Sequence, residues 1–130
     1  MNENSIAEII VDCAYHIHVK TGPGLFESVY ELILAEHLRS RGLSVKRQCP
    51  VSINFEDLKF GKAFIADMTV ENKVIIELKS KEKLNSVDKK QLLTYLKMTG
   101  LKLGLLINFG ESRIKDGIKR IINGDISTEI

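Results

Sequence analysis

The sequence predicts an α/β fold in which a mixed central sheet is flanked by helices. Apolar residues recur at spacings of three and four near the start of the chain and again in its second half, which is typical of amphipathic helices. Other segments carry alternating or continuous apolar runs, which are typical of strands. Because one strand follows a helix whereas others are joined by tight turns, parallel and antiparallel pairs should occur in the same sheet.

Two helices are expected first. An apolar face predicts a helix over residues 5–19, and the segment TGPG at residues 21–24 ends it. The second helix should run from about Leu25 to Arg41, with Gly42 just beyond its end. Its inward positions are Val29, Leu32, Ile33 and Leu38.

Three strands joined by turns should follow. The expected strands cover residues 51–55, 60–70 and 74–79, and the turns cover residues 56–59 and 71–73. Tight turns favour antiparallel neighbours, so these strands should form a meander.

The second half of the chain should add a helix, a strand and a closing helix. Ser86 is the expected N-cap of the first of these helices and Gly100 its stop. The strand should cover residues 103–109. The isoleucines at positions 114, 118, 121 and 122 then predict a closing amphipathic helix.

The length and composition are those of one globular domain over residues 1–130, with 44% hydrophobic and 28% charged residues. The longest apolar runs are too short to cross a bilayer, and the acidic start is unlike a signal peptide. We therefore expect a cytoplasmic protein without a membrane partner.

The charge is unevenly distributed. Residues 1–72 hold 7 basic and 10 acidic side chains, whereas residues 73–120 hold 12 basic and 5 acidic ones. The second segment could face an anion such as nucleic acid, although a solvated surface explains it equally well.

Two acidic residues should meet on neighbouring strands. Apolar alternation places Phe64, Ala66, Met68 and Val70 on one face of the second strand, and Val74, Ile76 and Leu78 on the same face of the third. The three-residue turn 71–73 sets Val70 opposite Val74, so Asp67 should lie opposite Glu77 on the other face.

This juxtaposition is unfavourable unless something offsets it. Two carboxylates roughly 5 Å apart repel by roughly 3 kcal/mol at an effective dielectric constant near 20. Protonation of one carboxyl, a salt bridge with Lys79 or a bound divalent cation would each relieve the repulsion, and only the cation needs both carboxylates. Alternatively, Glu77 and Lys79 simply lie on the solvated face of an edge strand.

The motifs resemble those of a known group. Asp67 followed ten residues later by Glu77-Leu78-Lys79 resembles the PD-(D/E)XK nuclease superfamily, although Ala66 stands where its name expects proline. QLLTY at residues 91–95 resembles the QxxxY helix element of one branch of that superfamily. GLFESVY at residues 24–30 is similar to the motif of the GxxExxY family of small nuclease-like proteins. The likeness runs from about Ile6 to Asn123.

The resemblance implies a restriction-endonuclease-like domain with an αβββαβ core, to which the apolar spacing adds a helix at each end. It also implies a nuclease that uses Mg²⁺ or Mn²⁺ and acts on nucleic acid, with DNA expected ahead of RNA. The implied metal ligands are Glu27, Asp67, Glu77 and the backbone carbonyl of Leu78, and the implied catalytic residues are Asp67, Glu77, Lys79 and Gln91.

Further residues would contact nucleic acid in this interpretation: Tyr95, Tyr30, Lys81, Lys83 and Lys90. Tyr30, one turn after Glu27, could instead orient Glu27 or simply pack. His18 matches a histidine of the GxxExxY family and would lie beside the site. The alternative function is a catalytically inactive nuclease-like module that binds nucleic acid or a protein. A homo-oligomer or a protein partner would supply any targeting.

Overall fold

A computed structural model describes residues 1–124, so the last six residues of the expected domain lie outside it. Three α-helices flank a five-stranded sheet: α1 (Glu3–Thr21), α2 (Glu27–Ser40) and α3 (Ser86–Thr99). The strands, in their order across the sheet, are β1 (Val45–Phe55), β2 (Leu58–Val70), β3 (Val74–Lys79), β4 (Leu103–Asn108) and β5 (Ile118–Ile122). Of the pairings described, only β3 with β4 is parallel, which confirms the predicted mixed sheet.

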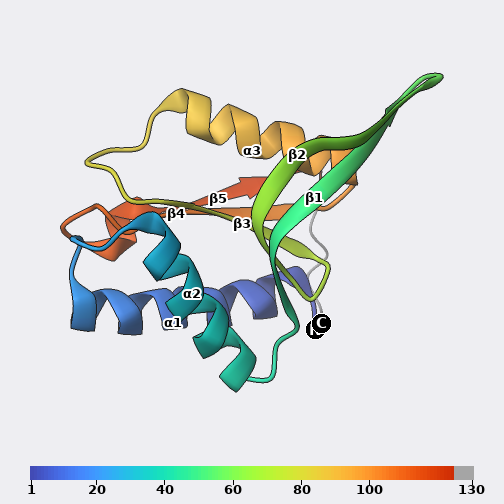
Figure 1. The fold of residues 1–130 in the computed structure, drawn as a ribbon. Helices are drawn as coiled ribbons and strands as arrows, with labels where there is room; N and C mark the ends of the chain where they lie inside the picture. Colours follow the sequence, from blue (N-terminus) through green and yellow to red (C-terminus); the bar gives the residue numbers. More distant parts are fainter. Residues whose placement is uncertain (125–130) are drawn as a thin grey trace.

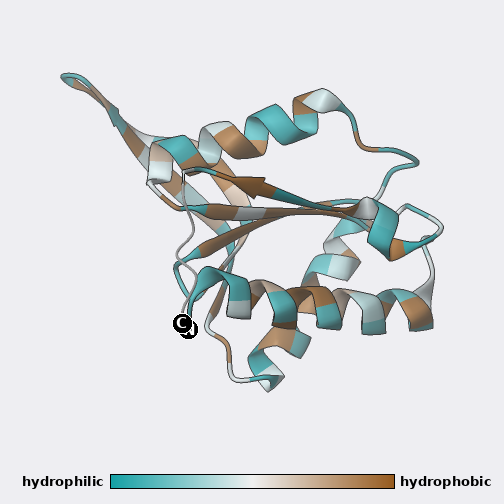
Figure 2. Ribbon diagram, turned by 180° about the vertical axis from the view of Figure 1, so that it is seen from behind, coloured by the Kyte–Doolittle hydropathy of each residue, from teal (hydrophilic) through white to brown (hydrophobic). Residues whose placement is uncertain are grey.

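The elements form three layers. Helices α1 and α2 cover one face of the sheet and α3 covers the other (Figure 1). The larger apolar core lies under α1 and α2, and a smaller one, which includes Ile75, Leu92 and Leu106, lies under α3. The central strands are accordingly mostly hydrophobic (Figure 2). No helix described by the structure has the length and apolar character needed to span a bilayer.

Strand β3 is central, with β2 on one side and β4 on the other. Its first five residues are buried, including Glu77, whose exposed fraction is 8%. The alternative of a solvated edge strand at Glu77 is therefore wrong.

Helix α3 begins one residue earlier than its predicted cap implied. Asn85, not Ser86, is the N-cap: its side chain accepts a hydrogen bond from the N–H of Asp88, and the Asp88 carboxylate accepts one from the N–H of Asn85. This reciprocal capping box satisfies two N–H groups at once. Gly100 ends the helix in the left-handed conformation, as predicted.

The predicted closing helix is wrong. Ile114–Gly117 forms only a short 3₁₀ turn, and Ile118–Ile122 is strand β5, antiparallel to β4. Ile118 packs on the larger core and Ile121 on the smaller one, which is strand alternation. A Cβ on Gly117 would lie 2.3 Å from the carbonyl oxygen of Asn108, so only glycine fits at this close approach.

The inward-facing side chains of β2 do not all lie on the same face of the sheet. Met68 packs on the larger core as expected, but Phe64 and Ala66 pack on the smaller one under α3. The expectation that all of them share one face is therefore wrong. The change occurs at Asp67, across from Gln48, which has a left-handed φ of 50° and interrupts the β1–β2 ladder.

Candidate active site

The proposed carboxylates meet where β2 leaves β3. The ladder between these strands covers Met68–Val70 and Val74–Ile76. Beyond it, the N–H of Leu78 donates to Oδ2 of Asp67 at 2.9 Å instead of to a strand carbonyl. The N–H of Asp67 approaches Oε1 of Glu77 at 3.3 Å. The structure thus brings the side chains of Asp67 and Glu77 together, as the hairpin register predicted.

The environment of Glu77 disfavours its charged form. Burial, followed by the charge of Asp67 and a hydrogen bond with its side chain, raises the pKa of Glu77 to about 8, although Lys79 acts in the opposite direction. Without a metal, this environment therefore favours the protonated form of Glu77. A cation bound between the two carboxyl groups would offset the same repulsion and displace that proton.

Glu27 is the third acidic group in this region. It begins α2, and the hydroxyl of Ser80, which follows β3, donates to the carbonyl of Leu25 at 2.9 Å, fixing the start of the helix near the end of β3. Burial and the charge of Asp67 raise the pKa of Glu27, whereas Lys79 lowers it. Glu27 therefore lies within electrostatic reach of Asp67 and Lys79.

Tyr30 supports the turn before Glu27. It is fully buried, its hydroxyl donates to the carbonyl of Gly22 and accepts from the N–H of Leu25, and its ring stacks on Phe109 with centroids 4.3 Å apart. The expected contact between Tyr30 and nucleic acid is therefore wrong, because the side chain has no exposed surface. The tyrosine of this motif instead shapes the loop that presents Glu27.

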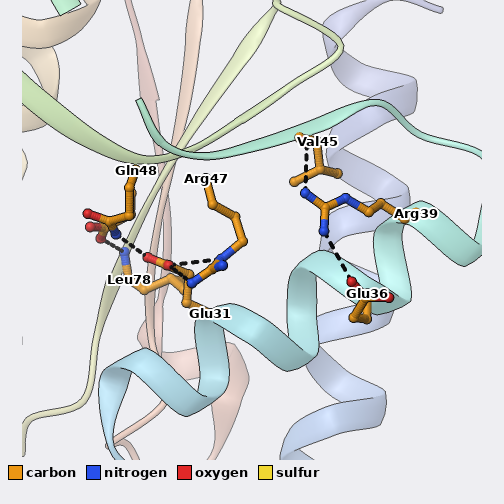
Figure 3. Close-up of polar contacts among 8 residues, drawn as sticks. Glu31, Glu36, Arg39, Val45, Arg47, Gln48 and Leu78 are labelled. Carbon is orange, nitrogen blue, oxygen red and sulfur yellow. Dashed lines mark hydrogen bonds and ion pairs between the residues drawn. The ribbon is translucent and has the colours of Figure 1, made fainter. Parts of the chain in front are cut away.

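A partly buried ion pair, which was not predicted from the sequence, lies beside these residues (Figure 3). Arg47 donates to Oε2 of Glu31 through Nη2 at 2.7 Å and Nε at 3.0 Å, and Gln48 donates to Oε1 at 2.7 Å. Figure 3 shows these groups next to Leu78. Because Glu31 binds Gln48, it stabilises the left-handed residue across from Asp67. The only sequence signal was that Glu31 follows Glu27 by four residues and so shares its helix face.

Replacing Glu31 with alanine should destabilise the protein by about 2 kcal/mol, because Arg47 and Gln48 lose their partner in a half-buried position. Glu36→Ala is the matched control, since Glu36 forms an exposed ion pair with Arg39 on the same helix and should cost less than about 0.5 kcal/mol. Urea unfolding measures both. Equal losses would show that the Glu31 network does not stabilise the fold as described.

Helix α3 contributes Tyr95 from the other face of the sheet. Its ring stacks on Phe64 with centroids 3.7 Å apart. Burial, with smaller contributions from Glu77 and Asp67, raises the pKa of Tyr95, so its hydroxyl lies near the carboxylates. Gln91, one turn earlier, is exposed and makes no side-chain hydrogen bond within residues 1–124.

Asn108 and Asp88, which were not predicted from the sequence, fix the loop after β3 through their contacts with Lys81. Asn108 accepts from the N–H of Lys81 at 3.0 Å and donates to its carbonyl at 2.8 Å. The ammonium of Lys81 pairs with Asp88 at 2.6 Å. Burial opposes ionisation of Asp88, but the hydrogen bonds from Lys81 and Asn85 outweigh it and lower the pKa of Asp88. In the sequence, the one sign of this contact was Asn108, a single polar residue at the end of an otherwise apolar strand.

The remaining predicted residues differ in their surroundings. Lys83 and Lys90 are exposed. His18 is buried, and its Nε2 forms a hydrogen bond with the carbonyl of Glu111 at 2.9 Å. Its ring lies 6.4 Å from that of Phe109. These contacts connect α1 with the loop after β4.

The donor set fits a hard divalent cation. The carbonyl of Lys79 accepts from Phe109 on the β4 side, so the carbonyl of Leu78 points to the β2 side, where Asp67 lies. Two carboxylates and one carbonyl supply oxygen ligands, which Mg²⁺ and Mn²⁺ prefer. Among the described residues, no three His, Cys, Asp or Glu side chains converge as a metal-holding group.

Comparison with known proteins gives one match. The family model described as the PD-(D/E)XK nuclease superfamily matches residues 4–121. No curated protein and no solved structure matches the chain.

Proposed function

The chain belongs to the PD-(D/E)XK nuclease superfamily, and from this premise we propose that it is a divalent-metal-dependent nuclease that hydrolyses phosphodiester bonds in DNA. Within the superfamily, we place it with the small GxxExxY proteins on the motif formed by Gly24, Glu27 and Tyr30. One observation carries the proposal: Asp67 and Glu77 converge at the divergence of β2 and β3, beside Lys79.

The ligands proposed for Mg²⁺ or Mn²⁺ are Asp67, Glu77 and the carbonyl of Leu78, with Glu27 acting on the ion or its waters. The bound ion would supply Lewis acidity and lower the pKa of a coordinated water. Asp67 is held for this role by the N–H of Leu78, so its orientation does not depend on the ion.

Other side chains would act on the substrate directly. Lys79, whose charge already acts on Glu77 and Glu27, would orient the attacking water and stabilise negative charge developing on the phosphoryl oxygens. Gln91 would bind the water or the phosphate, and Tyr95 would contact a base or sugar from α3.

Charge supports nucleic acid as the substrate. Residues 73–120, which include β3 and α3, hold 12 basic and 5 acidic side chains. Lys81, Lys83 and Lys90 would contact the phosphate backbone, with Lys81 exchanging Asp88 for phosphate. A cytoplasmic location, and targeting by a second copy or another protein, belong to the same proposal.

The second candidate is an inactive module that binds nucleic acid or protein. It is favoured by the hydrogen bond between the side chains of Asp67 and Glu77, because a proton on one of the two carboxyl groups stabilises the pair without any ion. In the described part of the chain, no buried side-chain nitrogen or oxygen lacks a partner.

Incubation with single- and double-stranded DNA and RNA in Mn²⁺, Mg²⁺ or EDTA distinguishes the two functions. The nuclease proposal predicts cleavage of DNA in Mn²⁺ or Mg²⁺ that EDTA abolishes. Binding without cleavage of any substrate in either metal would instead establish the binding module.

A further inference from the structure

Strands β1 and β2 continue beyond the body of the sheet as a two-stranded arm, defined as residues 51–65 (Figure 1). Strand β2 pairs with β3 only over Met68–Val70, so in the described chain the arm strands have only each other as sheet neighbours. An isolated two-stranded hairpin is marginally stable in water. Apart from Val51 and Phe64, which pack on the smaller core, the arm therefore lacks the packing that stabilises the other strands.

One face of the arm is apolar and exposed. The pairs Ile53–Phe60 and Phe55–Leu58 place four large apolar side chains on the same face. The exposed fractions are 58% for Phe55, 60% for Leu58 and 46% for Phe60. Contiguous apolar groups of this kind mark interaction surfaces.

The charges of the arm favour a protein over nucleic acid. Glu56 and Asp57 form its turn, and Lys59 and Lys62 lie on β2, so the arm has no net charge. Proteins that insert apolar side chains into DNA surround them with basic groups that bind the phosphates. The acidic turn would instead repel phosphates.

The same charges are self-complementary. Two arms can stack face to face about a two-fold axis that lies between them, over the Asn54–Lys59 pair. This axis lies at the centre of the apolar face, and the two stacked arms run antiparallel. Counting equal distances from this axis along the strands, the turn Glu56–Asp57 of one copy falls opposite Ser52 and Gly61 of the other, and Lys62 is the next residue on β2. The acidic turn would therefore meet Lys62 of the second copy at both ends of the interface.

We propose that the arm is a homodimer interface, in which two copies bury their apolar arm faces against each other and pair the acidic turn with Lys62. The proposal does not depend on whether the carboxylate site cleaves nucleic acid. It assigns the exposed apolar side chains to one partner, a second copy of the chain.

Light scattering after size exclusion tests the interface, because a dimer has twice the 14.6 kDa mass of the chain. The wild type should be dimeric at micromolar concentration, and Phe55→Ser with Leu58→Ser should be monomeric. Val19→Ser with Val87→Ser is the matched control, since both valines are exposed on helices outside the arm and the dimer should persist. Circular dichroism melting checks that each variant folds.

A charge exchange tests the register. Lys62→Glu should weaken dimerisation at least tenfold, and Glu56→Lys with Asp57→Lys should do the same. The chain carrying all three changes should recover the dimer. A monomeric wild type, or a failure of the triple variant to recover, would overturn the proposal. So would a monomer whose arm variants lose only DNA binding, because the arm would then be a nucleic-acid contact.

Discussion

Replacing Glu77 with glutamine should abolish metal-dependent cleavage of DNA, and replacing Lys79 with methionine should slow it at least about 100-fold. Glutamine keeps the length of the side chain and can still accept from the N–H of Asp67, but its neutral amide is a poor ligand for a hard cation. Methionine keeps the apolar stem of Lys79 and removes the charge that would stabilise the transition state.

Single-turnover cleavage rates in Mn²⁺ measure both losses. Glu82→Gln is the control, because Glu82 is an exposed acid in the loop after β3 and its change should leave the rate within about twofold. Undiminished cleavage in both the Glu77 and the Lys79 variants would place the active site elsewhere.

In metal-free protein, stability should fall as pH rises from about 5 to 9, and Glu77→Gln should remove most of this loss. The folded state raises the pKa of Glu77 from its ordinary value of 4.5 to about 8, so it binds the proton more tightly than the unfolded chain does. Its stabilising contribution is therefore complete below pH 4.5 and lost as the pH passes through 8. The full effect is at most roughly 5 kcal/mol, because one pKa unit corresponds to about 1.4 kcal/mol.

Melting temperatures in EDTA across this pH range test the linkage. At pH 8 the Glu77→Gln variant should melt several degrees above the wild type, and near pH 4.5 the two should coincide. Glu82→Gln should follow the wild type throughout. A difference between wild type and Glu77→Gln that does not change with pH would contradict the raised pKa.

The meeting of Asp67 and Glu77 was predictable because side chains alternate along a strand and the turn length fixes which residues face each other. Val70 lies opposite Val74, as the three-residue turn required. The change of side along β2 was not predictable. It coincides with the left-handed conformation of Gln48 on the neighbouring strand, whose side chain donates a hydrogen bond to Glu31 of α2.

The C-terminal isoleucines show a different limit. Their spacing fits a helix face, but Ile118, Ile121 and Ile122 also fit a short strand. Tertiary contacts favour the strand. Residues 118–122 pair with the edge of β4, and Ile118 packs on the larger core whereas Ile121 packs on the smaller one. β-branched side chains also pack well on such a surface.

Motif residues could be found from the sequence, but their roles could not. Tyr30 and Glu27 lie three residues apart in one motif, yet Tyr30 is fully buried against Phe109 whereas Glu27, at the helix start, is only partly shielded from solvent. Whether a motif residue is buried depends on residues far away in the chain, such as Phe109, and the spacing within the motif gives no information about them.

Calorimetric titration with Mn²⁺ at pH 7, in two buffers of different ionisation enthalpy, tests most directly whether Asp67 and Glu77 jointly hold a cation. Because Glu77 is protonated without metal, binding to the wild type should release close to one proton, and Glu77→Gln should neither bind comparably nor release it. Mn²⁺ binding that is unchanged in Glu77→Gln and releases no proton, or no binding to the wild type, would contradict the account.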